Sequence, residues 1–453
     1  YAVLNVPTLL FRPPAVYENM TLTRWWSLAD VVQLGASSQI VNQMDAINSL
    51  EQHLSRAIKL QSLADVPLGA FLSGGVDSSA IVALMQQQAS RPVKTFTVGF
   101  EEAGFDESPH ARSVAKHLGT DHTEFFVTAA EAKDVIARLP SIYDEPFADS
   151  SQIPTYLVCH TAHKHVTVAL SGDAGDELFG GYNRYFWGPR IWAKLAWLPY
   201  PVRQAIGALI SALPVAGWDA LSFPLNALLP YGQGIINAGD KAHKLAARLH
   251  GVRDLDDLYK SLVSEWQDPA HVVRGNNGFS VLEPSSLLAD ALPKASLTGA
   301  VNSPLRMMYR DTMTYLPDDI LCKVDRAAMA SSLETRVPFL DHRVAELAWK
   351  LPLGMKIMDG QGKWPLRQVL YRHVPRELID RPKAGFGIPI GQWLRGSLRP
   401  WAENLLDQNR LNTESYFNPE PIREKWAEHL SGRRDHTASL WAVLMFQAWL
   451  QQS

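Results

Sequence analysis

The sequence has 453 residues, of which 46% are hydrophobic and 20% are charged, and its 43 Lys and Arg residues nearly balance 46 Asp and Glu residues. This composition is that of an ordinary globular protein, which excludes a disordered, collagen-like or coiled-coil chain. The formal net charge of −3 lacks the positive excess of a dedicated nucleic-acid-binding protein, so no nucleic-acid partner is expected. The length predicts about two to four domains.

Cysteine content and hydropathy bear on the cellular compartment. Two cysteines, Cys159 and Cys322, cannot form a disulfide framework, and their scarcity favours a reducing compartment, so we expect a cytoplasmic location. The most apolar stretch, residues 204–229, is interrupted by Pro214 and Pro224. Because a membrane span needs about 20 uninterrupted apolar residues, this stretch predicts a buried or surface-lying helical pair and no membrane span.

The first 43 residues are interrupted by proline and show no sustained periodicity. We interpret residues 1–43 as an N-terminal arm or as the end of a preceding domain. From Asp45 onward, apolar residues recur with the helical period, which predicts a helix with Asp45 as a candidate N-cap residue.

Strands and helices alternate in the next part of the chain. The predicted strands are 68–72, 93–98, 122–127 and 166–170, and the predicted helices are 78–88, 107–118, 129–139 and 153–163. This alternation predicts a parallel sheet covered by helices on both faces, with ligands at the carboxyl ends of the strands. After Trp187 the strand pattern fades, and Trp- and Leu-rich segments predict a large helical C-terminal part. The predicted fold class is therefore α/β.

A glycine-rich turn follows the first predicted strand and reads Ser-Gly-Gly-Val-Asp-Ser-Ser over residues 73–79. Glycines before a helix let backbone N–H groups approach an anion, and the helix dipole favours negative charge there. The hydroxyls of Ser73, Ser78 and Ser79 add donors. Asp77 would repel a phosphate unless a cation such as Mg²⁺ lies between them. The simpler interpretation is a strand–turn–helix junction whose polar residues are helix caps.

This turn differs from the GxxxxGK[ST] phosphate loop because no lysine follows its glycines. It resembles the SGGxDS loop of the N-type ATP pyrophosphatases. The resemblance implies a parallel-sheet ATP pyrophosphatase unit in which residues 73–79, including Gly74 and Gly75, bind the β- and γ-phosphates of ATP. ATP is then cleaved between its α- and β-phosphates.

A second glycine-rich turn follows the last predicted strand and reads Ser-Gly-Asp-Ala-Gly-Asp-Glu-Leu-Phe-Gly-Gly-Tyr over residues 171–182. Three carboxylates within five residues are costly to place together unless a cation or another partner is nearby; the plain alternative is a solvated acidic turn. The segment resembles the motif S-G-[ED]-G-x-D-E-x-F-G-G-Y of the glutamine-dependent asparagine synthetase family. Ala174 departs from that motif, in which glycine is usual.

The resemblance implies roles for individual residues of the two turns. Asp77 and Asp176 correspond to the Mg²⁺-binding pair, and Asp173 to the position linked to acyl-adenylate formation, where many members have the longer Glu. The positions that contact adenosine are Leu72, Val98, Ser171 and Gly172.

Two later segments also match the family. Asp319 and Arg326 lie in a stretch that flanks the amino-acid substrate pocket in the family, although the stretch is equally explained as a charged helix that ends near a proline. Lys383, between Pro382 and two glycines, matches a loop lysine that stabilises charge on the α-phosphate and the departing pyrophosphate, a role that suits a point charge.

Together these motifs imply an ATP- and Mg²⁺-dependent, AMP-forming carbon–nitrogen ligase. The β-carboxylate of aspartate is adenylated, and ammonia converts the acyl-adenylate into asparagine. We expect an asparagine synthetase domain over residues 44–453, comprising a nucleotide-binding α/β part (44–190) and a mostly helical part (191–453). Residues 1–43 are the expected remnant of a missing glutaminase domain, so the chain is expected to use free ammonia unless such a domain or partner supplies it from glutamine.

Several alternatives stay open at this point. The carboxylate substrate could instead be a uronic acid of a surface polysaccharide or the precursor of a β-lactam. The chain could also be a nucleotide-binding partner that lacks catalysis. The resemblance leaves a homodimer open as well.

Overall fold

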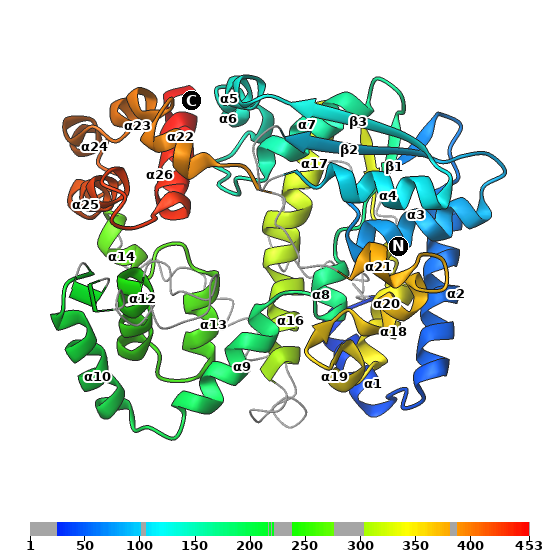
Figure 1. Cartoon of the computed structure of the whole chain (residues 1–453), viewed down its shortest axis with the longest axis horizontal. Coiled ribbons are helices and arrows are strands. Elements are labelled where there is room, and N and C mark those ends of the chain that lie inside the picture. Colours follow the sequence, from blue (N-terminus) through cyan, green and yellow to red (C-terminus); the bar gives the residue numbers. More distant parts are fainter. Residues whose placement is uncertain are drawn as a thin grey trace, which may run out of the picture.

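The computed structural model contains a parallel five-stranded sheet (Figure 1). The structure describes residues 25–100, 106–215, 217–218, 220–221, 238–275, 303–380 and 387–452. The strand order of the sheet is β3-β2-β1-β4-β5, and every neighbouring pair is parallel. The strands are β1 (Leu68–Phe71), β2 (Lys94–Phe100), β3 (Asp121–Val127), β4 (Val168–Leu170) and β5 (Glu334–Arg336). The predicted α/β fold class is confirmed.

Helices cover both faces of this sheet. Alternate side chains of a strand point to opposite faces, and in β4 the side chain of Leu170 joins one hydrophobic cluster whereas that of Ala169 joins the other. Helices α3 (Val76–Gln88) and α4 (Ser108–Leu118) pack on the first face, and α7 (Gln152–Ala162) and α17 (Cys322–Met329) pack on the second.

The predicted elements from residue 68 to residue 170 are present with shifts of one or two residues at most ends. One predicted helix, 129–139, is instead two helices, α5 (Ala129–Ile136) and α6 (Leu139–Tyr143). Pro140 lies in the first turn of α6, where its missing N–H costs no helical hydrogen bond.

The N-terminal region contains more helix than the sequence indicates. Within residues 25–43 the chain forms a helix, α1 (Leu28–Ser37), whose apolar face is buried in the first hydrophobic cluster, and the assignment of residues 1–43 to an arm or to the end of a preceding domain stays a prediction. The following helix, α2 (Gln43–Gln61), begins before Asp45, because the side chain of Asn42 accepts the N–H groups of Met44 and Asp45. Residues 1–24 lie outside the described residues.

The division at residue 190 does not separate two independent units. Strand β5 comes from the C-terminal part, yet it pairs with β4 with Arg336 opposite Leu170. The sheet is therefore completed by the part of the chain that was predicted to be helical.

The remaining elements are mostly helices, and many are short. They are α8 (Gly175–Phe179), α9 (Arg184–Leu195), α10 (Tyr200–Ala212), α12 (Ala238–Gly251), α13 (Leu255–Val263), α14 (Pro269–Val272), α16 (Ser303–Met313), the π-helical turn η2 (Leu316–Leu321), the 3₁₀ turn η3 (Pro338–Leu340), α18 (His342–Lys350), α19 (Leu353–Lys356), the hairpin β6 (Ile357–Met358) and β7 (Gln361–Gly362), α20 (Trp364–Leu370), α21 (Arg376–Ile379), α22 (Ile390–Arg395), α23 (Arg399–Leu405), α24 (Gln408–Glu414), α25 (Pro419–Leu430) and α26 (Thr437–Gln452). Among the described residues, no helix is both long and apolar enough to cross a membrane.

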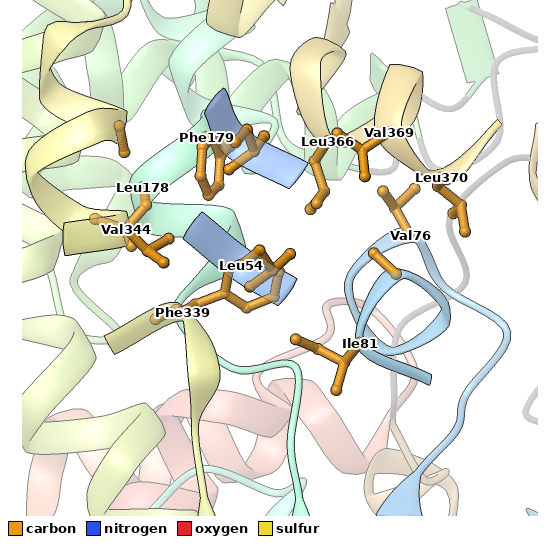
Figure 2. Close-up of a cluster of buried hydrophobic side chains, with 14 of the residues drawn as sticks. Leu54, Val76, Ile81, Leu178, Phe179, Phe339, Val344, Leu366, Val369 and Leu370 are labelled. Carbon is orange, nitrogen blue, oxygen red and sulfur yellow. The ribbon is translucent and has the colours of Figure 1, made fainter. Parts of the chain in front are cut away.

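One hydrophobic cluster fixes the two helices that carry the glycine turns. Figure 2 shows Val76 of α3 and Phe179 of α8 in the same cluster as Leu54 of α2, Phe339 of η3 and Leu366 of α20. The first residues of α3 and the whole of α8 are thus anchored by buried side chains, and their polar residues point away from this core.

Candidate nucleotide-binding site

The two glycine-rich turns lie side by side at the carboxyl ends of neighbouring strands. Ala70 of β1 pairs with Leu170 of β4; the second turn begins directly after Leu170, and the first turn begins at Ser73, three residues after Ala70. A Cβ atom added to Gly172 would lie 2.8 Å from the backbone nitrogen of Ser78, so the second turn contacts the start of α3. The order in which the chain adds strands reverses between β1 and β4, and ligands bind at such a switch point in open parallel sheets.

The first turn has the backbone geometry of an anion-binding loop. Gly74 has φ +72°, a left-handed conformation that favours glycine, and an added Cβ atom would lie 2.8 Å from the backbone nitrogen of Ala111. The hydroxyl oxygen of Ser78 accepts the N–H of Ser73 at 3.2 Å, and the hydroxyl of Ser73 accepts the N–H of Gly75 at 3.3 Å. These bonds hold the loop in shape at the N-terminus of α3, which favours negative charge.

The second turn is strained where the sequence departs from the family motif. Ala174 has φ +69°, a conformation that costs a non-glycine residue about 1–2 kcal/mol. The hydroxyl of Ser171 donates to the buried carboxylate of Asp173. Burial, together with the nearby carboxylates of Asp77 and Asp176, raises the pKa of Asp173 above its usual range.

A buried lysine joins the two turns. The Nζ atom of Lys363 lies 2.8 Å from an oxygen of Asp176, and it also donates to the carboxylate of Asp77. Only 6% of Lys363 is exposed. Burial lowers the pKa of Lys363, but attraction to the two carboxylates outweighs burial, so the pKa lies above its ordinary value and the ammonium stays charged. Asp77 and Asp176, predicted as a pair, are therefore brought together.

Sequence reasoning did not find Lys363. The residue follows the hairpin β6–β7 and precedes α20 in the run Gly-Gln-Gly-Lys-Trp-Pro, where its pattern is that of an ordinary loop lysine. A weak sign was available, because the first turn lacks the lysine of other phosphate loops and a cation from elsewhere was needed.

The residues present fit a magnesium ion. Asp77 and Asp176 share one cation, the Lys363 ammonium, so their carboxylates are close enough to share another. Mg²⁺ prefers oxygen ligands and is commonly held by one or two carboxylates together with substrate phosphates. Among the described residues no group of three or more His, Cys, Asp or Glu side chains is placed to hold a metal, so the remaining ligands would have to come from a nucleotide and water.

A cavity of ≈ 960 Å³ contains nearly all the predicted nucleotide-binding residues. The predicted residues that line it are Leu72, Ser73, Gly74, Gly75, Asp77, Ser78, Val98, Ser171, Gly172, Asp173 and Asp176. Ser79 is fully buried beneath the turn and is not part of the described lining. Lys383 lies outside the described residues, so its predicted place beside the nucleotide is not observed.

The other wall of the cavity carries a second buried lysine. Lys323 donates to Asp149 at 2.7 Å and to the hydroxyl of Ser151 at 2.8 Å, and all three residues line the cavity. Burial lowers the pKa of Lys323, but the attraction to Asp149 raises this pKa by more, so it lies above its ordinary value. These polar groups were not singled out in the sequence.

The roles of Asp319 and Arg326 as substrate contacts stay predictions. Neither Asp319 nor Arg326 is part of the cavity's described lining, and Arg326 lines a separate cavity of ≈ 450 Å³ beside β5. The carboxyl group of Asp319 interacts with that of Asp149, a residue that lines the cavity. Burial together with the charge of Asp149 raises the pKa of Asp319 to about 7.

Glu177 adds a buried carboxyl group to the same cavity. Only 1% of Glu177 is exposed, and its Oε1 atom accepts a hydrogen bond from the hydroxyl of Tyr182 at 2.6 Å. Its Oε2 atom has no hydrogen-bond partner among the described residues. Burial raises the pKa of Glu177 to about 7, so this group is neutral for much of the acidic range.

Comparison with known proteins agrees with this geometry. The profile of the asparagine synthase family matches residues 49–451. Asparagine synthetase [glutamine-hydrolyzing] 1 of Bacillus subtilis is 30% identical over 87% of this chain and 57% of its own length, and a putative asparagine synthetase of Mycobacterium tuberculosis is 34% identical over 91% and 59%. The protein named amidase chyE of Penicillium rubens is 24% identical over 83% of this chain and 57% of its own length.

The chain thus spans less than three fifths of the length of these relatives. The family profile nevertheless extends over both the sheet and the helical part, including the segments that carry Asp77, Asp176 and Lys363. The chain belongs to the asparagine synthase family.

Proposed function

We propose that this chain is the synthetase part of an ATP-dependent, AMP-forming enzyme that converts a carboxylate, by family resemblance the β-carboxylate of aspartate, into an amide. The observation that carries the proposal is the meeting of Asp77, Asp176 and Lys363 in one cavity that both glycine turns line. A triphosphate needs such a combination of backbone donors and cations, whereas an ordinary structural turn does not.

In the proposed complex, adenosine lies against Leu72 and Val98, and the phosphates lie along the turn that contains Gly74 and Gly75. A Mg²⁺ ion held by Asp77 and Asp176 would neutralise phosphate charge. Since an ammonium and a magnesium ion cannot occupy the same place between two carboxylates, Lys363 would turn toward the phosphate oxygens if the metal were held there. Its charge would then compensate the departing pyrophosphate.

The carboxylate substrate attacks the α-phosphorus and forms an acyl-adenylate with release of pyrophosphate. This step gives the carboxyl carbon a good leaving group, and ammonia then displaces AMP. The protein contributes positioning and electrostatic stabilisation. The polar wall formed by Asp149, Ser151 and Lys323 offers both a cation and hydrogen-bond acceptors, which suits a substrate that carries a carboxylate and an amino or hydroxyl group.

The test is pyrophosphate release from ATP by the purified chain with Mg²⁺, ammonium and one carboxylate at a time. Aspartate is expected to give equal amounts of pyrophosphate, AMP and asparagine. Asp176→Asn should raise the Mg²⁺ concentration needed for half-maximal release by about tenfold, since a carboxylate ligand is lost. The matched control is Asp65→Asn, an exposed residue away from the cavity, which should behave as the unmodified chain.

Other outcomes select the alternatives. Release with a uronic acid but not with aspartate would assign the chain to amidation of another carboxylate, and the name of the Penicillium relative is consistent with a wider range of amide chemistry in the family. ATP binding without AMP formation from any carboxylate would favour a non-catalytic nucleotide-binding partner. Replacing ammonium by glutamine in the same assay tests whether the chain itself can release ammonia from glutamine.

A further inference from the structure

An exposed apolar stripe runs along helix α10, far from the cavity. Val202, Ile206 and Leu209 are exposed and lie at positions i, i+4 and i+7, so they share one side of the helix. Trp197, three residues before α10, is 74% exposed, and Leu209 is 75% exposed. We call these four residues the α10 patch. The rest of the outward side is Ala and Ser, and no charged residue of α10 is exposed.

The opposite side of α10 is firmly packed on α12. An added Cβ atom on Gly207 would lie 3.0 Å from the backbone oxygen of Ala246, so the two helices are in close contact. The one charged residue of α10, Arg203, is buried and donates to the backbone oxygens of Leu198, Val252 and Arg253. The packing of α10 on α12 and the hydrogen bonds of Arg203 therefore fix the orientation of α10, with the α10 patch facing outward.

Positive charge is concentrated in this part of the sequence. Residues 184–257 contain eight Lys and Arg residues and five Asp residues, a formal charge of +3. The rest of the chain contains 35 Lys and Arg residues against 41 Asp and Glu residues, a formal charge of −6. Arg190, Lys194, Lys241 and Arg253 are exposed basic residues of this region. Such asymmetry indicates an anionic partner surface.

We propose that the α10 patch and its basic surroundings bind the surface of an anionic lipid bilayer. An apolar helix face with a Trp beside it and basic residues around it is the arrangement of helices that lie in the membrane interface. α10 has 13 residues, which is about 20 Å of helix and too short to cross a bilayer, so it lies along the surface. The exposed Trp197 beside the apolar face favours a bilayer over an acidic protein surface, because Trp is enriched at the membrane–water interface.

The position of the patch suits a peripheral enzyme. In Figure 1, α9 leads from α8 to α10, which lies at the lower left edge of the molecule, away from the sheet. Trp187 of α9 lines the cavity, so the same helix connects the cavity to the bilayer-facing corner. Binding there leaves the nucleotide-binding turns uncovered.

The experiment is sedimentation of the full chain with vesicles of phosphatidylcholine alone and of phosphatidylcholine mixed with phosphatidylglycerol. The unmodified chain should bind the anionic vesicles, and binding should weaken as salt is raised. The double variant Ile206→Glu/Leu209→Glu should bind at least about tenfold more weakly. Leu34→Glu/Met44→Glu, which places the same two charges on exposed apolar residues of α1 and α2, is the matched control and should bind as the unmodified chain.

Retained circular dichroism and unchanged ATP binding would show that the double variant is folded, since its substitutions lie outside the cavity. The proposal is overturned if the unmodified chain ignores anionic vesicles or if the double variant binds them equally well. It is also overturned if the unmodified chain does not bind vesicles but forms a dimer, and the double variant is a monomer. The patch would then contact a second copy of the chain.

Discussion

The ammonium of Lys363 lies 2.8 Å from the carboxylate of Asp176 and also pairs with Asp77, although the three residues come from three separate segments of the chain. Two like charges brought this close repel each other unless a cation lies between them. The lysine therefore has two roles in the proposed cycle. It compensates the two carboxylates in this structure, and it would become available to the phosphates once a metal replaced it.

Replacing Lys363 tests this double role. Lys363→Met should lower the rate of pyrophosphate formation by about a hundredfold or more, because a preorganised charge at the reacting phosphates is lost. Lys363→Arg should recover part of the rate, since the charge is kept. The measurement is the steady-state rate at saturating ATP and Mg²⁺, with Lys59→Met on the exposed surface of α2 as control. A Lys363→Met chain with an unchanged rate would contradict the role.

Contact between the two glycine turns can be tested at Gly172. A Cβ atom at this position would lie 2.8 Å from the Ser78 nitrogen and 3.0 Å from the Asp77 carbonyl carbon, so the backbone must shift. Gly172→Ala should destabilise the fold by about 1–3 kcal/mol and weaken ATP binding by at least about tenfold, since α3 and its turn are displaced.

Gly354→Ala is the matched control for that substitution. No heavy atom lies within 4 Å of the Cβ atom it would add, so ATP binding should be unchanged. Because Gly354 lies in helix α19, where alanine is favoured over glycine, stability should stay the same or rise by up to about 1 kcal/mol. Isothermal titration with ATP and urea unfolding measure the two quantities. Equal behaviour of the two alanine variants would mean that the turns do not touch as described.

The buried carboxyl group of Glu177 predicts a pH dependence of stability. Its pKa rises from an ordinary value of 4.5 to about 7 on folding, so between these values the folded chain holds a proton that the unfolded chain has released. Stability must then fall as pH rises through this window. Above it, ionisation costs on the order of 3 kcal/mol. Glu177→Gln keeps the shape and removes the ionisation, so its stability should fall less.

The measurement is the free energy of unfolding in urea at about pH 5 and about pH 8. The difference in the free energy of unfolding between Glu177→Gln and the unmodified chain should favour the variant more at the higher pH. Glu377→Gln, at an exposed position, should follow the unmodified chain at both values. An advantage of equal size at the two pH values would show that Glu177 ionises freely in the folded chain.

Local sequence patterns predicted the part of the fold that builds the turns. β1 and β4 are short apolar runs followed by glycine, and each of these features is visible within ten residues. The same patterns predicted that both turns lie at the carboxyl ends of the strands, whereas the pairing of Asp77 with Asp176 was implied by the resemblance to the asparagine synthetase family.

The rest depended on contacts that no local pattern encodes. β5 is three residues long and reads Glu-Thr-Arg, so it shows neither alternation nor a hydrophobic run, and its strand conformation follows from pairing with β4. Lys363 and Lys323 resemble surface lysines in sequence. Only packing of α20 and α17 against the sheet layers turns them inward.

The most direct test of the central claim follows the oxygen atoms of the substrate. Adenylation joins a carboxylate oxygen to the α-phosphorus, and amination leaves that oxygen on AMP. With aspartate labelled with oxygen-18 in its β-carboxylate, the proposed reaction transfers one labelled oxygen to each AMP, which mass spectrometry detects. Asparagine formed alongside unlabelled AMP, or alongside ADP and phosphate, would contradict the account.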